Sequence, residues 1–302
     1  IAGALARSGV DVSVVARGAH LQAIVRDGLR VHSELGDFTV AVPAAADLRE
    51  LGTFDWIIVT LKAHQWDDVL PQFDGFATTE ATLVPMQNGL PFWYFHDRSL
   101  NCVDPGGRLR AQFPDDRIVG TVVHASGNVP SPGVVHQSGG RLYPMGELNG
   151  CSSERLERLS AMFVRAGLDA PAQPAIRREV WRKLLGNASL NPVSTLTRST
   201  IGAMLDDPDT RALIAEVMRE TIAVAKAAGC DPEIEVNERI AFASRLTDVK
   251  TSMLQDFEAN RPLELDPIVG AVVELAGEFG VDAPRTASVY ALAKRLDRAS
   301  RA

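Results

Sequence analysis

Three polar side chains recur at intervals of four residues in one predicted helical segment: Lys183, Asn187 and Asn191. Residues four apart lie on nearly the same face of a helix, so this spacing predicts a polar stripe with one cation and two amides. A lysine can protonate a carbonyl oxygen while hydride is added to the carbonyl carbon, and amides can hold a neighbouring carboxylate or hydroxyl. The same spacing is also typical of a solvated helix face, so the stripe alone leaves both interpretations open.

Arg17 ends a strand-like run and is followed by Gly18 and a predicted helix at residues 19–26. In dinucleotide-binding folds this position usually holds an acidic residue that binds the ribose 2′-hydroxyl of NAD. A permanently charged guanidinium suits the 2′-phosphate of NADP instead. An ordinary exposed arginine is the alternative.

Lys62 and Asn88 each follow an apolar run, at residues 56–61 and 81–86. Open α/β sheets bind ligands beyond the carboxyl ends of their strands, so both side chains are candidates for cofactor or substrate contacts. Gly89 would allow the backbone to approach closely. A solvated lysine and an Asn-Gly turn are the alternatives.

The runs that carry these residues alternate with helix-like segments, as in a parallel sheet buried on both faces. The sequence therefore predicts an α/β, Rossmann-like doubly wound domain over residues 1–173. Further strands are expected at 10–16, 118–123 and 134–146, a hairpin turn at 35–37, and helices at 63–73 and 153–166. The dinucleotide fingerprint GxGxxG is not found, and since residues 1–9 resemble the end of a helix, we infer that the first strand and its Gly-rich loop are missing.

Residues 174–302 are predicted to form an all-α domain, with helices at 175–196, 209–228, 234–246, 268–279 and 287–299. The segment 101–114 is rich in Pro, Gly and Arg without apolar periodicity, so we expect an irregular surface excursion there.

The composition excludes several classes of protein. The formal net charge of -7 argues against a nucleic-acid partner. No apolar run of about 18 residues could cross a bilayer, and no secretion signal is evident, so we expect a cytoplasmic protein. Cys102, Cys151 and Cys230 show neither a disulfide pattern nor metal-ligand spacing, the six histidines are dispersed, and no metal is predicted.

Five ordered motifs make the chain similar to the ketopantoate reductase (2-dehydropantoate 2-reductase) family over nearly its whole length. They are VVARGAHL at 14–21, VTLKAHQ at 59–65, QNG at 87–89, WRKLLGNASLNP at 181–192 and SMLQDFEANRPLELD at 252–266.

The resemblance implies reduction of a 2-oxo acid by NADPH, specifically of 2-dehydropantoate to (R)-pantoate in pantothenate biosynthesis. It implies that Arg17 and Lys62 bind NADPH, that Asn88 contacts cofactor and substrate, and that Lys183 is the general acid. It further implies that Asn187, Asn191 and Ser252 bind the substrate and that Glu264 positions Lys183 or accepts from the substrate hydroxyl. A homodimer formed through the helical domain is compatible with it.

Two departures from the family pattern leave the substrate open. An asparagine usual after the Asn-Pro step is absent from residues 194–201, so a hydroxyl or Arg198 would have to replace it, and another is absent before Gly270. The alternatives are a reductase of another branched 2-keto acid and an opine or 3-hydroxyacid type of dehydrogenase, although the latter usually employs a catalytic histidine. A non-catalytic NADP-binding regulator is a further alternative.

Overall fold

The computed structural model describes residues 1–301 and divides the chain into two compact units. The first comprises Ile1–Leu61, Gln65–Gln87 and Gln112–Ile176, and it combines strands with helices. The second comprises Lys62–His64, Asn88–Ala111 and the chain from Arg177 onward, and it is almost wholly helical. The predicted fold class is confirmed, while the proposed boundary between residues 173 and 174 stays a prediction.

The strands at the centre of the α/β unit are short and buried. β5 (Trp56–Val59) pairs in parallel with β6 (Thr82–Pro85), as expected for successive strands of a doubly wound fold. β7 (Val119–Thr121) follows next to β6 and pairs antiparallel with β10 (Met145–Glu147). A separate parallel pair joins β1 (Val14–Val15) to β4 (Ala44–Ala45).

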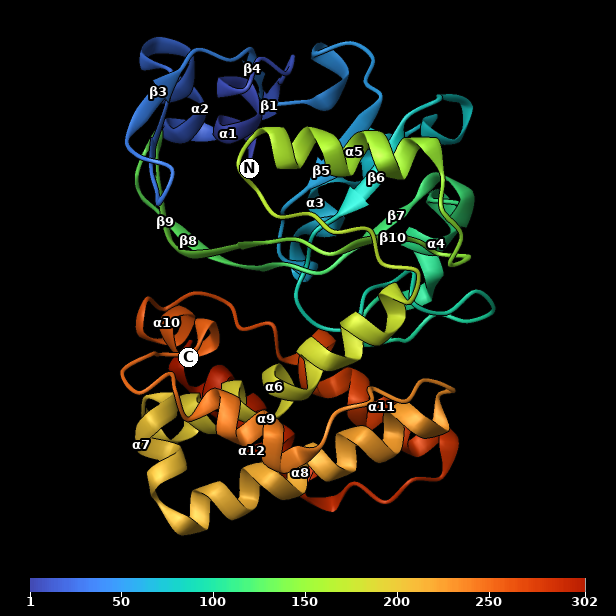
Figure 1. The fold of residues 1–302 in the computed structure, drawn as a ribbon, viewed down its shortest axis with the longest axis vertical. Coiled ribbons are helices and arrows are strands. Elements are labelled where there is room, and N and C mark those ends of the chain that lie inside the picture. The colour runs from blue at the N-terminus through green and yellow to red at the C-terminus, as the bar shows by residue number, and fades with distance from the viewer. Residues whose placement is uncertain (302) are drawn as a thin grey trace. The chain divides into compact units, whose positions relative to one another are not determined.

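Helices cover this sheet on an apolar face. α5 (Glu154–Arg165) begins at Ser153, whose hydroxyl accepts a hydrogen bond from the backbone N–H of Leu156 and so caps the helix. Apolar residues of α5 and of α1 (Ala2–Arg7) pack with those of β6, β7 and β10 in one cluster. Figure 1 shows α5 running alongside β5 and β6, and α2 (Gly18–Asp27) close to β1 and β4. Full burial of one large apolar side chain such as Phe163 contributes roughly 1.5–3 kcal/mol.

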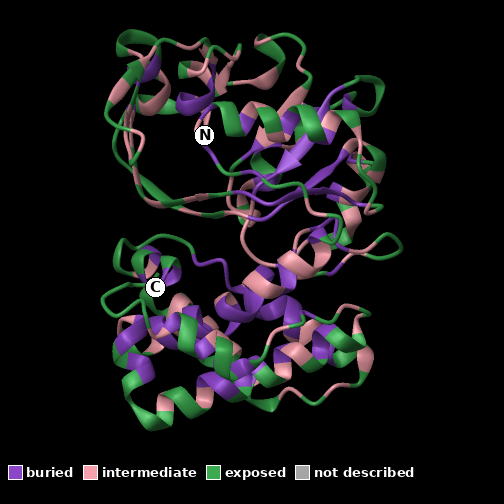
Figure 2. Ribbon diagram, viewed as in Figure 1, coloured by how far each residue is buried: buried purple, intermediate pink, exposed green. Residues whose placement is uncertain are grey.

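A second sheet of the α/β unit is largely solvated. Its strand order is β3 (Phe38–Val40), β2 (Leu29–His32), β9 (Val134–Leu142) and β8 (His124–Ser131). The hairpin between β2 and β3 was expected from the sequence, whereas β8 was not, because no strand was predicted at residues 124–131. Figure 2 shows this long pair mostly exposed, in contrast to the buried β6, β7 and β10.

Two predicted segments differ from the structure. The segment 101–114 is not wholly irregular, because it contains the 3-10 turn Pro105–Gly107 and α4 (Arg108–Gln112). The buried carboxylate of Asp104 accepts hydrogen bonds from the N–H groups of Leu109 and Arg110, and a helix this short shows no periodicity. The predicted helix 63–73 is divided into Ala63–Gln65, α3 (Trp66–Val69) and Leu70–Phe73, because Pro71 cannot donate a backbone hydrogen bond. Other single 3-10 turns span Leu48–Glu50, Phe76–Thr78 and Asp115–Arg117.

The helical unit contains the predicted helices and two that the sequence analysis missed. The predicted ones are α6 (Ile176–Thr197), α8 (Pro208–Ala227), α9 (Val236–Ala243), α11 (Ala271–Phe279) and α12 (Pro284–Ser300). The missed ones, α7 (Ile201–Asp206) and α10 (Ser252–Glu258), are each capped by a threonine, Thr200 and Thr251. A single π-helical turn, Asp266–Gly270, leads into α11.

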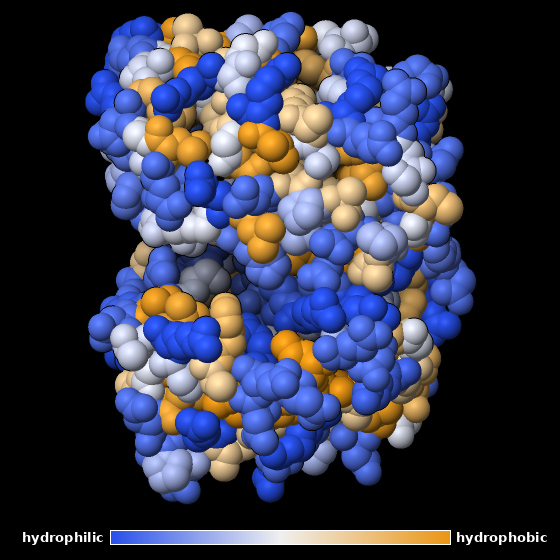
Figure 3. Space-filling model, in the orientation of Figure 1, coloured by the Kyte–Doolittle hydropathy of each residue, from blue (hydrophilic) through white to orange (hydrophobic). Residues whose placement is uncertain are grey.

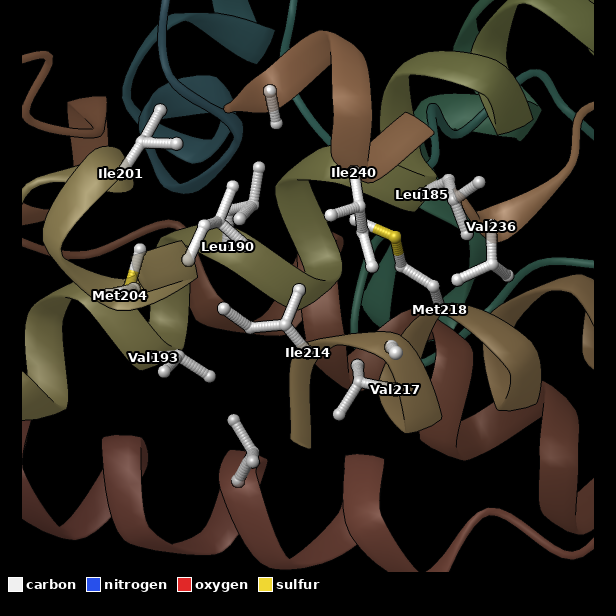
Figure 4. Packing of buried hydrophobic residues seen from close by; sticks show 14 residues of the cluster. Leu185, Leu190, Val193, Ile201, Met204, Ile214, Val217, Met218, Val236 and Ile240 are labelled. Carbon is white, nitrogen blue, oxygen red and sulfur yellow. The ribbon is translucent and has the colours of Figure 1, made fainter. Parts of the chain in front are cut away.

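One apolar core joins α6, α7, α8 and α9 of this unit, with Val289 of α12 added to it. Figure 4 shows Leu185, Leu190 and Val193 of α6 together with Ile214, Val217 and Met218 of α8, and with Val236 and Ile240 of α9. The leucines of α6 thus occupy its buried side and leave the Lys183 stripe available for polar contacts.

The surface drawn in Figure 3 is mainly hydrophilic, with apolar side chains scattered between polar ones. No helix formed by residues 1–301 combines the length and apolar character needed to span a membrane.

Candidate active site

Lys183, Asn88 and Glu264 form a hydrogen-bonded chain within the helical unit. The ammonium of Lys183 donates to Oδ1 of Asn88 at 2.7 Å, and Nδ2 of Asn88 donates to Oε2 of Glu264 at 3.3 Å. The other Glu264 oxygen accepts from the backbone N–H of Ala63 at 3.5 Å. Three residues that the sequence analysis singled out from separate motifs are therefore brought together.

Local backbone geometry fixes Asn88 in this chain. β5 and β6 run parallel, so Lys62 and Asn88 leave the same edge of the sheet, and Gln87 donates to the backbone oxygen of Leu61 between them. Gly89 follows with φ +87°, and a Cβ at this position would collide with the backbone of Pro267 in the π-helical turn. The N–H of Leu90 donates to the Pro267 oxygen at 2.8 Å. The close approach predicted at Gly89 is therefore made to the backbone of Pro267.

The environment of Lys183 brings its pKa close to neutral pH. Burial disfavours the charged ammonium and lowers the pKa of Lys183 to about 8, while the carboxylate of Glu264 acts in the opposite direction. A lysine with this pKa is still largely protonated at pH 7 and can release its proton more readily than a solvated lysine. These are the properties required of a general acid.

Asn187 and Asn191 extend the stripe along α6. The side chain of Asn187 is partly exposed and makes no hydrogen bond to any described residue. Asn191 is only 6% exposed, and its Nδ2 has no hydrogen-bond partner among residues 1–301. Buried amide groups are nearly always paired, so an unpaired donor here suits an acceptor brought by a ligand.

Lys62 forms an ion pair with Asp256 of α10, and Asp256 also accepts from Nε of Arg261 at 2.8 Å. Asp256 was not predicted as a site residue from the sequence. Its position four residues after Ser252, and therefore on the same side of α10, was the signal that could have identified it. The Lys62 side chain remains about 30% exposed.

Ser252 and Arg17, like Asn187, Asn191 and Lys62, lie outside the hydrogen-bonded chain of Lys183, Asn88 and Glu264. Ser252 is exposed at the first turn of α10, and its hydroxyl makes no hydrogen bond to the residues that the structure describes. Arg17 belongs to the α/β unit, at the start of α2, where its exposed guanidinium lies 3.5 Å from the carboxylate of Asp68.

Four of the five hydroxyls in residues 194–201, where the missing asparagine would lie, donate to the backbone instead. Ser194 Oγ donates to the oxygen of Ser199 at 2.7 Å, and Thr195 Oγ1 to that of Asn191 at 2.9 Å. Arg198 is exposed, with its guanidinium 5.5 Å from the ring centroid of Phe257. Besides Arg198, the hydroxyl of Thr200 stays able to donate a hydrogen bond, because it only accepts one from the N–H of Ala203.

Within residues 1–301, no group of three or more His, Cys, Asp or Glu side chains is arranged to hold a metal ion.

Two family models match the chain. The one described as Ketopantoate reductase PanE/ApbA matches residues 1–150, and the one described as Ketopantoate reductase PanE/ApbA C terminal matches residues 175–297. The second range holds Lys183, Asn187, Asn191, Ser252 and Glu264.

Named relatives agree with these matches. The chain is 41% identical to 2-dehydropantoate 2-reductase from Mesorhizobium japonicum, over 95% of this chain and 90% of that protein. Among solved structures, a ketopantoate reductase homologue from Ralstonia solanacearum MolK2 superposes with a TM-score of 0.93 at 36% identity, covering 98% of this chain and 93% of that one. The 2-dehydropantoate 2-reductase from Methylococcus capsulatus gives a TM-score of 0.87 at 28% identity, with 100% and 94% covered. The predicted family is confirmed: the chain belongs to the ketopantoate reductase family.

Proposed function

We propose that the protein is a reductase that uses NADPH to convert 2-dehydropantoate (ketopantoate) to (R)-pantoate in pantothenate biosynthesis. The observation that carries this proposal is the chain Lys183–Asn88–Glu264, which holds a lysine of near-neutral pKa in a site with further amide groups. The names of the relatives support the choice of substrate.

A bound nicotinamide would supply the hydride that C2 of the 2-oxo acid receives. Lys183 donates a proton to the oxygen at C2 as negative charge develops there, which leaves a neutral amine. Glu264 favours the protonated lysine before the reaction, and Asn88 transmits this effect because it hydrogen-bonds both groups. Solvent then returns a proton to Lys183.

We assign substrate binding to Asn187, Asn191 and Ser252. The unpaired Nδ2 of Asn191 supports this role, since a carboxylate or hydroxyl oxygen would satisfy it. The side chains of Asn187 and Ser252 likewise make no hydrogen bond to any described residue.

We assign the 2′-phosphate of NADPH to Arg17. The donor set fits a phosphate: an exposed guanidinium stands at the first turn of the ten-residue helix α2, where backbone N–H groups also favour anions. Gly18, with φ +56° and open space around its Cα, leaves room beside it. Lys62 is assigned to the cofactor as well, with Asp256 holding its ammonium in place.

Reduction of another branched 2-oxo acid is the second candidate. The hydroxyls of Ser194 and Thr195 donate to the protein backbone and so do not replace the missing asparagine. Arg198 adds a positive charge to the same segment. The homodimer stays a prediction.

The test is oxidation of NADPH followed at 340 nm with the purified full-length protein, ketopantoate and a panel of other 2-oxo acids. We expect turnover with ketopantoate. Faster turnover with another acid would keep the reaction and change the substrate, whereas no turnover with any acid would overturn the proposed function.

A further inference from the structure

Arg239 lies on α9 with its guanidinium against Gly186 of α6. The buried side of α9 packs into the apolar core through Val236, Ile240 and Ala243 (Figure 4). Arg239 follows Val236 by three residues and precedes Ala243 by four, so it lies next to this side of the helix. A Cβ on Gly186 would collide with Nη2 of Arg239, so the missing side chain at Gly186 provides the space that the guanidinium fills.

The positive charge of Arg239 is not balanced within the described chain. Its Nη1 is buried without a hydrogen-bond partner, and none of the carboxylates in residues 1–301 lies within ion-pair distance of the guanidinium. Burial holds the pKa of Arg239 below its usual range. The ring of Phe242, whose centroid is 5.4 Å from Cζ, offsets only part of this cost. Cations removed from solvent are normally paired, so a half-buried guanidinium whose buried Nη1 has no partner has a place for an anion.

This cation borders the catalytic stripe. Gly186 lies three residues after Lys183 and directly before Asn187. Side chains three apart on a helix are neighbours, so a group in contact with Gly186 lies beside the turn that carries Lys183. Neither the sequence motifs nor the hydrogen-bonded chain from Lys183 to Glu264 includes Arg239.

We propose that Arg239 binds the carboxylate of the 2-oxo acid, while the stripe on α6 receives the carbonyl group next to it. The planar guanidinium matches the two oxygens of a carboxylate, and a ligand of this charge would satisfy the buried Nη1. Because the carboxylate carbon is bonded directly to the reacting C2, holding it at Arg239 keeps the C2 oxygen close to Lys183. Arg239 is thus a residue that selects acids over neutral ketones, and this assignment rests on the proposed function.

The test compares Arg239→Met with Arg245→Gln, which removes an exposed arginine from the segment that follows the same helix. We expect Arg239→Met to raise KM for ketopantoate roughly 10- to 100-fold, the range for losing hydrogen bonds to a charged group, with KM for NADPH unchanged. Arg245→Gln should leave both KM values unchanged. Gly186→Ala, which displaces the guanidinium without removing it, should also raise KM for ketopantoate.

Urea unfolding separates a binding role from a structural one. Because Arg239 is half-buried and its buried Nη1 has no acceptor, Arg239→Met should unfold at a midpoint equal to or above that of the wild-type protein. A lower midpoint together with an unchanged KM for ketopantoate would show that Arg239 only supports packing, and would overturn the proposal.

Oxamate, a carboxylate that resembles a 2-oxo acid, tests the site without turnover. It should raise the melting temperature of the wild-type protein and of Arg245→Gln, and have little effect on Arg239→Met. If the wild-type protein reduced no 2-oxo acid but oxamate protection still depended on Arg239, the proposed function would fail and the anion site would stand. Equal protection of all three proteins, or none of any, would refute the anion site.

Discussion

Replacing Glu264 by glutamine should move the alkaline limit of the reaction to lower pH. Reduction requires protonated Lys183, whose pKa of about 8 is set by burial, which lowers it, and by Glu264, which raises it. The wild-type rate should therefore be level below the pKa and fall as the pH rises through about 8. Glu264→Gln removes the contribution that raises the pKa while it keeps the size of the side chain.

The expected displacement follows from the bridging geometry. Glu264 acts on Lys183 across the amide of Asn88, through hydrogen bonds of 3.3 Å and 2.7 Å. Two unit charges separated by a bridging amide, on the order of 6 to 8 Å apart, interact by roughly 2 to 3 kcal/mol at an effective dielectric constant of about 20. One pKa unit corresponds to about 1.4 kcal/mol, so complete loss of the attraction between Glu264 and Lys183 lowers the pKa of Lys183 by about two units. If solvent already screens part of this attraction, the pKa of Lys183 falls by at least about one unit.

The assay is the pH profile of kcat for ketopantoate reduction between pH 5 and 9.5. In the wild-type protein, roughly 90% of Lys183 is protonated at pH 7. In Glu264→Gln, a pKa near 6.5 would leave only about a quarter of Lys183 protonated at the same pH. The variant should therefore be about four-fold slower than the wild-type protein at pH 7 and recover its rate at pH 5.5. Glu258→Gln, at an exposed carboxylate paired with Lys250, is the matched control and should keep the wild-type profile. A uniform loss of rate at every pH, with the limit still near 8, would refute this reasoning.

Three further substitutions test separate parts of the site. Arg17→Gln should raise KM for NADPH roughly 10- to 100-fold and leave KM for NADH unchanged, as initial rates with both cofactors would show; equal changes would remove Arg17 from the 2′-phosphate. Gly89→Ala should lower the free energy of unfolding by about 1–3 kcal/mol, because the alanine is strained at φ +87° and meets the backbone of Pro267; an unchanged urea midpoint would contradict this. Asn191→Ala should raise KM for ketopantoate about ten-fold without lowering the urea midpoint, since its buried Nδ2 has no partner to lose; an unchanged KM would exclude Asn191 from the substrate site.

Much of the fold was predictable because strong local signals agreed with it. The apolar runs at 56–61 and 81–86 became the parallel pair β5–β6, and Ser153 capped α5 as its sequence position indicates. The spacing of Lys183, Asn187 and Asn191 required only that α6 be a continuous helix, and it is one even through Pro192. The short helices were missed because threonine or aspartate caps define them rather than apolar periodicity.

The contacts of the site were less accessible to sequence reasoning. Glu264 was linked to Lys183 only through family resemblance, since no spacing rule relates two positions on distant segments. Asn88 bridges Lys183 and Glu264 because the neighbouring Gly89 packs against Pro267. This is a tertiary contact, which the local sequence does not indicate. Asp256 and Arg239 gave no motif of their own, because the burial and pairing that distinguish them exist only in the folded chain.

The central claim is that Lys183 is the general acid, and Lys183→Ala tests it most directly. In single-turnover reduction of ketopantoate with saturating NADPH, loss of the proton donor should lower the rate by roughly two to four orders of magnitude. The Kd for NADPH, measured by fluorescence titration of the same protein, should stay within about two-fold of the wild-type value. A variant that binds NADPH normally and reduces ketopantoate at nearly the wild-type rate would contradict the role given to Lys183.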